Sequence, residues 1–203
     1  MPMRFLTCDS CCRRHAGYAF IKRLIRLGVS AAVIELKRNI SCHLIDGEAG
    51  ISSATRERAL GYRQALAQFR LPLSDDKVYR DRYNGGNSYD DFCQVIASGA
   101  QLPTALVTDD DVIAVGVMRA LQDAGYRVPE DISIVGFNNR PVCELVHPML
   151  TSIDVPKQDF STEAVDALVS LIQKQQRGEL PKLAVKRRIT TTLIERQSVC
   201  RIP

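Results

Sequence analysis

The segment from Val128 to Asn139 constrains the fold of this chain more than any other. It contains a short apolar run, Ile132 to Phe137, that ends in two amide side chains. Apolar, β-branched runs between turn signals are typical of strands buried on both faces. An earlier run, Thr104 to Thr108, has the same character and is followed by three aspartates, Asp109, Asp110 and Asp111. Two strands are therefore expected to end in polar groups.

The residues between these two runs have the pattern of one helix. Asp110 is a suitable N-cap, and Gly125 is a suitable stop. The apolar positions between them recur at helical spacing, at Ile113, Val117, Leu121 and Ala124. A strand, a helix and a strand in this order predict parallel strands joined by a right-handed crossover. Ligands bind at the carboxyl ends of strands in such sheets.

Similar patterns predict the remaining elements. Helices are expected over 16–27 (ending at Gly28), 53–69, 88–98 and 158–173, and strands over 30–35, 40–45, 77–80 and 189–194. In the helix over 158–173, the inward positions are expected to be Ala164, Leu168, Leu171 and Ile172.

Composition excludes several classes of protein. The chain has 203 residues, of which 45% are hydrophobic and 25% charged, which suits an α/β protein with one sizeable core or two small lobes. No apolar run reaches membrane-spanning length, and the run at Met1 to Leu6 is too short for the apolar region of a signal peptide. A cytoplasmic protein is therefore expected. The net charge of +4 is modest and dispersed, which does not favour direct nucleic-acid binding.

The seven cysteines raise the question of a metal site. Cys8, Cys11 and Cys12 lie near His15, with His43 further on, and thiolates with imidazoles can hold zinc. A second cysteine pair at a fitting separation is absent, so reduced, unpaired cysteines without metal are the preferred interpretation.

Several segments, in this order and spacing, resemble the effector-sensing domain of LacI/GalR-type bacterial transcription regulators. They are residues 56–66, 105–120, 128–138 and 148–154. The resemblance is strong over 40–196, weaker over 16–28 and absent over 1–7. It implies a periplasmic-binding-protein-like α/β fold with three αβα layers and a mainly parallel sheet, one lobe being complete and the other partial.

The resemblance also implies a domain organisation. Residues 38–153 form a complete effector-binding lobe, and residues 154–203 return into a partial first lobe. Residues 1–37 form an N-terminal segment of uncertain pairing, with a helix over 16–28 and about nine extra residues before Arg38, more than a usual αβ loop. Because no helix-turn-helix or first lobe precedes the matching part, the chain is expected to be N-terminally truncated. The apolar face of the helix over 158–173 would then lack part of its usual partner.

Four residues match ligand-binding positions of the family. By resemblance, Arg58 grips the ligand, Tyr83 forms an aromatic wall, and Asp110 and Asn138 are polar residues at strand ends. Each also has a structural interpretation: Arg58 as a solvated helix residue, Tyr83 as loop packing, Asp110 as an N-cap, and Asn138 as a left-handed turn residue.

Two of these positions depart from the family, which often has Asn at the position of Asp110 and Asp at that of Asn138. A carboxylate, an amide and a guanidinium together still suit a ligand with many hydroxyl groups. The predicted effector is therefore a sugar, and a glucoside of the maltose type is the specific guess.

The predicted function is sugar sensing by a homodimer, with two lobes closing on the effector and operator DNA bound through a domain absent from this chain. No cofactor, metal or membrane is expected to take part. An enzyme is disfavoured because the chain has no nucleophile elbow, phosphate loop or zinc-protease helix, and His147 is interpreted as part of a turn. The alternatives are an inactive remnant of a regulator and a stand-alone sugar-binding protein.

Overall fold

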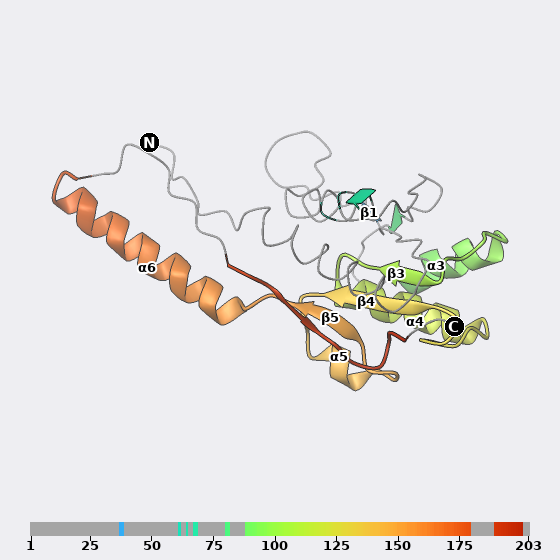
Figure 1. Ribbon diagram of the computed structural model, residues 1–203. Coiled ribbons are helices and arrows are strands. Elements are labelled where there is room, and N and C mark those ends of the chain that lie inside the picture. The colour runs from blue at the N-terminus through green and yellow to red at the C-terminus, as the bar shows by residue number, and fades with distance from the viewer. Residues whose placement is uncertain are drawn as a thin grey trace.

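The computed structural model describes residues 88–179 and 189–200, the short stretches 37–38 and 80–81, and the isolated positions 61, 64, 67 and 68 (Figure 1). The four isolated positions are helical, within the helix expected over 53–69. The helix expected over 16–27 and the strand expected over 40–45 lie outside the described residues, as do the expected strand over 30–35 and the cysteine cluster near His15.

The described core is built on a four-stranded sheet in the order β3 (Ala105–Val107), β4 (Ser133–Phe137), β5 (Thr151–Asp154) and β6 (Thr192–Ile194). The first three strands are parallel and β6 is antiparallel to β5. The parallel pairing of β3 with β4 confirms the predicted strand–helix–strand unit. A separate two-stranded parallel sheet contains β1 (Lys37–Arg38) and β2 (Arg80–Asp81).

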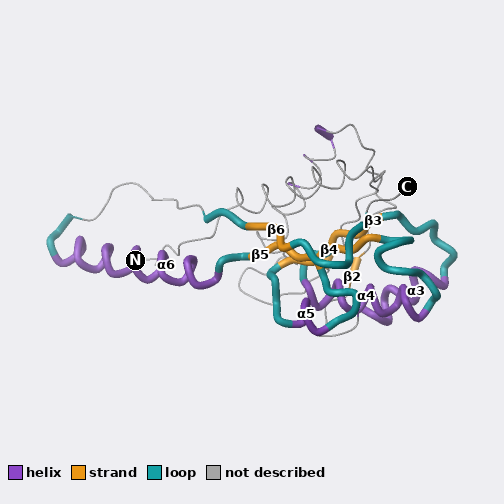
Figure 2. The backbone as a smooth tube through the Cα atoms, turned by 60° about the horizontal axis from the view of Figure 1, so that its bottom comes forward, coloured by secondary structure: helices purple, strands orange, loops and turns teal. Residues whose placement is uncertain are grey.

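The helices with described bounds are α3 (Ser88–Ala97), α4 (Asp111–Asp123), α5 (Val142–Leu145) and α6 (Lys157–Gln176). The first three lie on one face of the four-stranded sheet, and α3 packs against α4 (Figures 1 and 2). The mostly parallel sheet with helices confirms the expected α/β class. None of the helices in this part of the chain combines the length and the apolar character that crossing a membrane requires.

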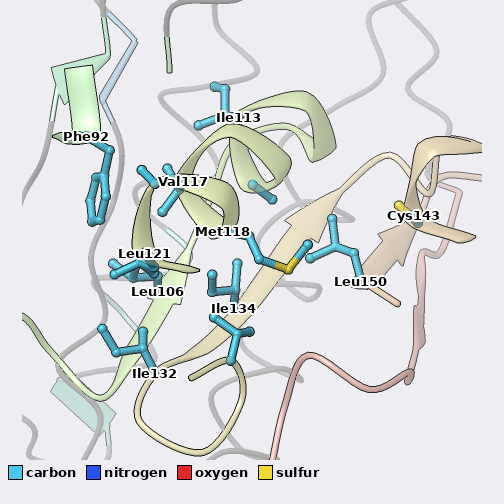
Figure 3. Packing of buried hydrophobic residues seen from close by; sticks show 13 residues of the cluster. Phe92, Leu106, Ile113, Val117, Met118, Leu121, Ile132, Ile134, Cys143 and Leu150 are labelled. Atoms are coloured by element: carbon cyan, nitrogen blue, oxygen red, sulfur yellow. The ribbon is translucent and has the colours of Figure 1, made fainter. Parts of the chain in front are cut away.

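The core lies between the sheet and helices α3 and α4, where apolar side chains from both layers meet (Figure 3). Its largest fully buried members include Phe92, Leu106, Ile113, Leu121, Ile134 and Leu150. The expected apolar face of α4 is buried at Ile113, Val117 and Leu121, but Ala124 is exposed because it caps the end of the helix. Gly125 follows with a φ of +88°, a conformation in which glycine is favoured because it has no Cβ.

Helix α6 extends away from the sheet in both views (Figures 1 and 2). Its existence is confirmed, but of the expected inward positions only Ala164 is half-buried, and the other three are exposed. Leu168 and Ile172 are about half exposed, and Ala167 is the residue of α6 that is buried. Helical spacing identifies which apolar residues share a side, but it does not reveal whether another surface covers them.

Two further elements differ from the expectations. Helix α5 was not predicted, because a single turn is too short to show a helical period. The closing strand expected over 189–194 forms only at β6, where it joins the sheet beside β5. The division of the chain into domains at residues 37 and 153 stays a prediction.

Candidate functional site

Polar side chains gather at the carboxyl ends of β3, β4 and β5. Strand β3 is followed, after Thr108, by Asp109, Asp110 and Asp111, and β4 is followed by Asn138, Asn139 and Arg140. Strand β5 contributes Ser152 and Asp154. The strands are parallel neighbours, so their carboxyl ends meet at one edge of the sheet.

Asp110 connects the start of α4 to the end of β4. One carboxylate oxygen accepts a hydrogen bond from the backbone nitrogen of Val112 at 3.0 Å, which makes Asp110 the N-cap of α4. The other oxygen accepts from Asn138 Nδ2 at 2.8 Å and from the guanidinium of Arg140 at 3.1 Å. The Asp110 side chain is only 3% exposed, so it mainly holds other groups in place.

Asp111 lies deeper, beneath this cluster. Its carboxylate accepts from Ser152 Oγ at 2.5 Å and from the backbone nitrogen of Arg140 at 2.7 Å. Burial raises the pKa of Asp111 above its ordinary value of 3.8, and the hydrogen bonds from Ser152 and Arg140 oppose this shift. The carboxylate approaches the sheet closely because Gly136 has no side chain: a Cβ at this position would overlap Asp111 Oδ1.

Asn138 and Asn139 both have left-handed backbone conformations, with φ of 101° and 47°. Asparagine is among the few residues that tolerate this region, which explains the amide pair after β4. The Asn138 carbonyl oxygen accepts from Lys157 Nζ at 2.6 Å. Asn139 donates to Asp154 at 3.0 Å and accepts from Arg196 at 2.9 Å, so the turn is connected to β5 and to the end of the chain.

Two of the predicted site residues, Asp110 and Asn138, lie in the described part of the chain. The structure brings them together, and a hydrogen bond joins them. Arg58 and Tyr83 lie outside the described residues. Sequence reasoning missed Arg140, whose side chain is 46% exposed and held by Asp110. In the sequence, Arg140 is recognisable only as a basic residue directly after the amide pair. Its position in the site depends on its contact with Asp110, which lies 30 residues earlier in the chain.

The arrangement can make directed hydrogen bonds but shows no sign of metal binding. Arg140 offers donors, the Asn138 amide offers a donor and an acceptor, and the aspartates orient them. Among the described residues, no group of three His, Cys, Asp or Glu side chains is placed to hold a metal ion. Burial, followed by the charge of Asp111, raises the pKa of the Cys143 thiol to about 11, so this thiol stays protonated at neutral pH.

A separate, shallow groove of about 750 Å³ lies at the opposite ends of the strands. Its lining includes Tyr126, Arg127, Glu130, His147 and Cys200. These residues precede β4 and β5 or follow β6, so the groove is distant from Asp110. The strand-end cluster is the better candidate because its polar groups converge and are held by buried partners.

Comparison with known proteins gives a consistent result. The model of the periplasmic binding protein-like domain family matches residues 22–199. The NTD biosynthesis operon regulator NtdR of Bacillus subtilis is 29% identical over 147 residues, which cover 72% of this chain and 43% of the regulator. The chain thus spans less than half the length of this curated relative.

Two solved structures share the fold. A sugar-binding transcriptional regulator of the LacI family from Escherichia coli, complexed with phosphate, has a TM-score of 0.73 at 23% identity, covering 98% of this chain and 66% of that protein. A LacI family regulator from Enterococcus faecium with bound ribose has a TM-score of 0.74 at 22% identity, covering 95% and 65%. The chain belongs to the periplasmic binding protein-like domain family, as an effector-binding domain of the LacI type.

Proposed function

We propose that the strand-end cluster binds a sugar, as the effector of a transcription regulator. The observation that carries this proposal is the hydrogen-bonded set of Asp110, Asn138 and Arg140 at the carboxyl ends of adjacent parallel strands. A half-exposed guanidinium and a side-chain amide, both oriented by a buried carboxylate, are suited to hydroxyl groups in fixed positions.

The charges in the cluster favour a neutral ligand. Asp110 forms an ion pair with Arg140, and Asp111 and Asp154 lie nearby with their own hydrogen-bond donors. An anionic ligand would approach several carboxylates, whereas a neutral polyol would meet both donors and acceptors. By resemblance, Arg58 would donate further hydrogen bonds to the sugar, and Tyr83 would pack against the apolar face of the sugar ring.

The proposed action is regulatory rather than catalytic. The relatives are transcription regulators, and one is bound to ribose. We infer that the sugar stabilises a closed arrangement of two lobes in a homodimer and changes the affinity of a helix-turn-helix domain for operator DNA. A ligand can do this only through different affinities for the two states.

The proposal is tested by thermal unfolding of the chain with a panel of mono- and disaccharides and purines. A ligand at a hundred times its dissociation constant adds about 2.7 kcal/mol of stability. One sugar should raise the unfolding temperature, and Asn138→Ala or Arg140→Ala should abolish most of that increase. Arg127→Ala is the matched control, since this exposed arginine pairs with Asp131 beside the groove at the other end. The proposal would be overturned if a purine but no sugar stabilised the chain. It would also be overturned if a sugar raised the unfolding temperature of the parent chain and of all the variants equally.

A further inference from the structure

Arg196 is a charged residue that the folded chain holds almost entirely out of solvent. It follows β6, and its side chain is only 10% exposed. One terminal guanidinium nitrogen donates to the backbone oxygen of Leu150 at 3.0 Å. The other donates to Asn139 Oδ1 and to Glu144 Oε1, both at 2.9 Å. Because the guanidinium is planar and its donors have fixed directions, these contacts hold the acceptors in fixed relative positions.

The backbone that carries Arg196 is itself attached to the sheet. The Arg196 nitrogen donates to Thr151 Oγ1 at 2.9 Å. Two residues later, the buried Ser198 hydroxyl accepts from the backbone nitrogen of Thr151 at 2.8 Å and donates to the backbone oxygen of Ile134 at 2.6 Å. The Arg196 side chain therefore extends from a segment that is hydrogen-bonded to both β4 and β5, so its position is well defined.

Asn139 is the contact of Arg196 that leads to the candidate ligand site. Its side-chain Nδ2 donates to Asp154 Oδ1 at 3.0 Å, and its Oδ1 accepts from Arg196. A guanidinium can only donate and a carboxylate can only accept, so these two partners together fix which way the Asn139 amide points. The backbone nitrogen of Asn139 donates to Ser152 Oγ at 3.1 Å, which attaches the turn to β5.

The turn after β4 needs such support. Asn138 and Asn139 follow one another with φ of 101° and 47°, and left-handed conformations are unfavourable for residues other than glycine. They persist only where the surrounding structure holds them. Asn139 lies between Asn138 and Arg140, so a change in its conformation would move both residues that are proposed to contact the sugar.

We propose that Arg196 is a positioning residue for the sugar site. Through Asn139, it holds the turn after β4 in the conformation that directs Asn138 and Arg140 toward the ligand. This inference rests on the proposed function, because the site that Arg196 serves is the strand-end cluster. Its other ionic contact has a different character: the Glu144 side chain is 67% exposed, and exposed ion pairs contribute little.

Isothermal titration calorimetry of the full chain with the same saccharides, beginning with maltose and ribose, tests the proposal. Arg196→Met retains a long side chain but has no donor, and it should raise the dissociation constant of the sugar about tenfold because the turn is released. Glu144→Ala is the matched control. It removes another acceptor of the same guanidinium nitrogen, and the dissociation constant should not change. Circular dichroism checks that each variant is folded.

Asn139→Gly distinguishes positioning from a general loss of structure. Glycine adopts left-handed conformations readily, so this variant retains the backbone of the turn and removes the acceptor of Arg196. It leaves the contacts of Arg196 with Leu150 and Glu144 in place, so it tests the proposal even if Arg196→Met does not fold. It should also weaken binding. Adding Arg196→Met to it should weaken binding much less than in the parent chain, because both changes remove the same contact.

The outcomes separate this inference from the proposed function. If the parent chain binds a sugar and Arg196→Met binds it equally well, the role of Arg196 is overturned and the sugar site stands. Equal weakening by Arg196→Met and Glu144→Ala, or fully additive effects of Arg196→Met and Asn139→Gly, would overturn it in the same way. If the parent chain binds no saccharide, the proposed function and this inference are both overturned.

Discussion

Asp110 combines two positioning roles in one carboxylate. One oxygen caps α4 at Val112, and the other orients Asn138 and Arg140. Both roles explain why an acidic residue suits this position, and they can be separated because they use different oxygens.

Substitution of Asp110 should therefore have graded effects. Asp110→Ala removes the cap and the acceptor for Asn138 and Arg140, so the free energy of unfolding should fall by about 1–3 kcal/mol. Asp110→Asn retains a capping oxygen and should be more stable than Asp110→Ala by roughly 1 kcal/mol. Urea unfolding of both variants measures this difference. Equal losses would show that the cap contributes little to stability.

Asp111 should make stability depend on pH. Its pKa is higher in the folded chain than in the unfolded one, mainly because of burial, so the folded state holds the proton more tightly. Its contribution to the free energy of unfolding is therefore greatest below the ordinary pKa of 3.8 and is lost as pH rises through the raised folded pKa. The parent chain should lose stability relative to Asp111→Asn over this window.

Asp131 provides a control of opposite sign. Hydrogen bonds from Arg127 lower the pKa of Asp131 to about 2, so its contribution is present above its ordinary pKa and is lost as pH falls toward about 2. The parent chain should gain stability relative to Asp131→Asn as pH rises. Urea unfolding of the three proteins from about pH 2 to pH 7 measures both slopes. If the stability difference between parent and variant changed with pH in the same direction for Asp111→Asn and for Asp131→Asn, the raised pKa of Asp111 would be contradicted.

At the scale of elements, the contact of α3 with α4 depends on Gly116. A Cβ at this position would overlap Ser88 Oγ and lie 2.9 Å from the backbone nitrogen of Tyr89. Alanine is the better helix former, by about 1 kcal/mol, so propensity alone predicts that Gly116→Ala stabilises the protein. Packing predicts the opposite.

Gly116→Ala should lower the free energy of unfolding by about 1–3 kcal/mol, because the two helices must move apart. Ser88→Ala removes one of the overlapping atoms and leaves the Tyr89 backbone, so the double variant should recover only part of the loss. Urea unfolding of both single variants and the double variant gives the coupling between the positions. A stabilised Gly116→Ala variant would show that the helices adjust freely.

At the scale of the whole molecule, stability should be uneven. Helix α4 has seven buried residues, and all of them except Asp111 belong to the hydrophobic core, whereas the buried residue of α6 is Ala167. Amides of α6 should therefore exchange with solvent hydrogen through local opening, much faster than amides of α4. Hydrogen exchange measured by mass spectrometry tests this expectation. Equal protection of the two helices would mean that α6 opens only together with the core.

The sequence by itself determined the local elements of the described core. Periodicity and end signals located β3, α4, β4 and α3, because spacing, the Asp110 cap and the Gly125 stop act within one element. Adjacent parallel strands also placed Asp110 and Asn138 at one edge, since the carboxyl ends of such strands meet.

Only the tertiary structure decided which of these residues contact each other. The contacts of Arg140 with Asp110 and of Ser152 with Asp111 join positions 30 and 41 residues apart, so they depend on the strand register and on the space beside Gly136. The exposure of Leu168 and Ile172 on α6 likewise depends on what covers the helix. Sequence periodicity is a property of one segment, whereas burial is a property of two surfaces that meet, and for that reason the inward face of α6 was predicted only in part.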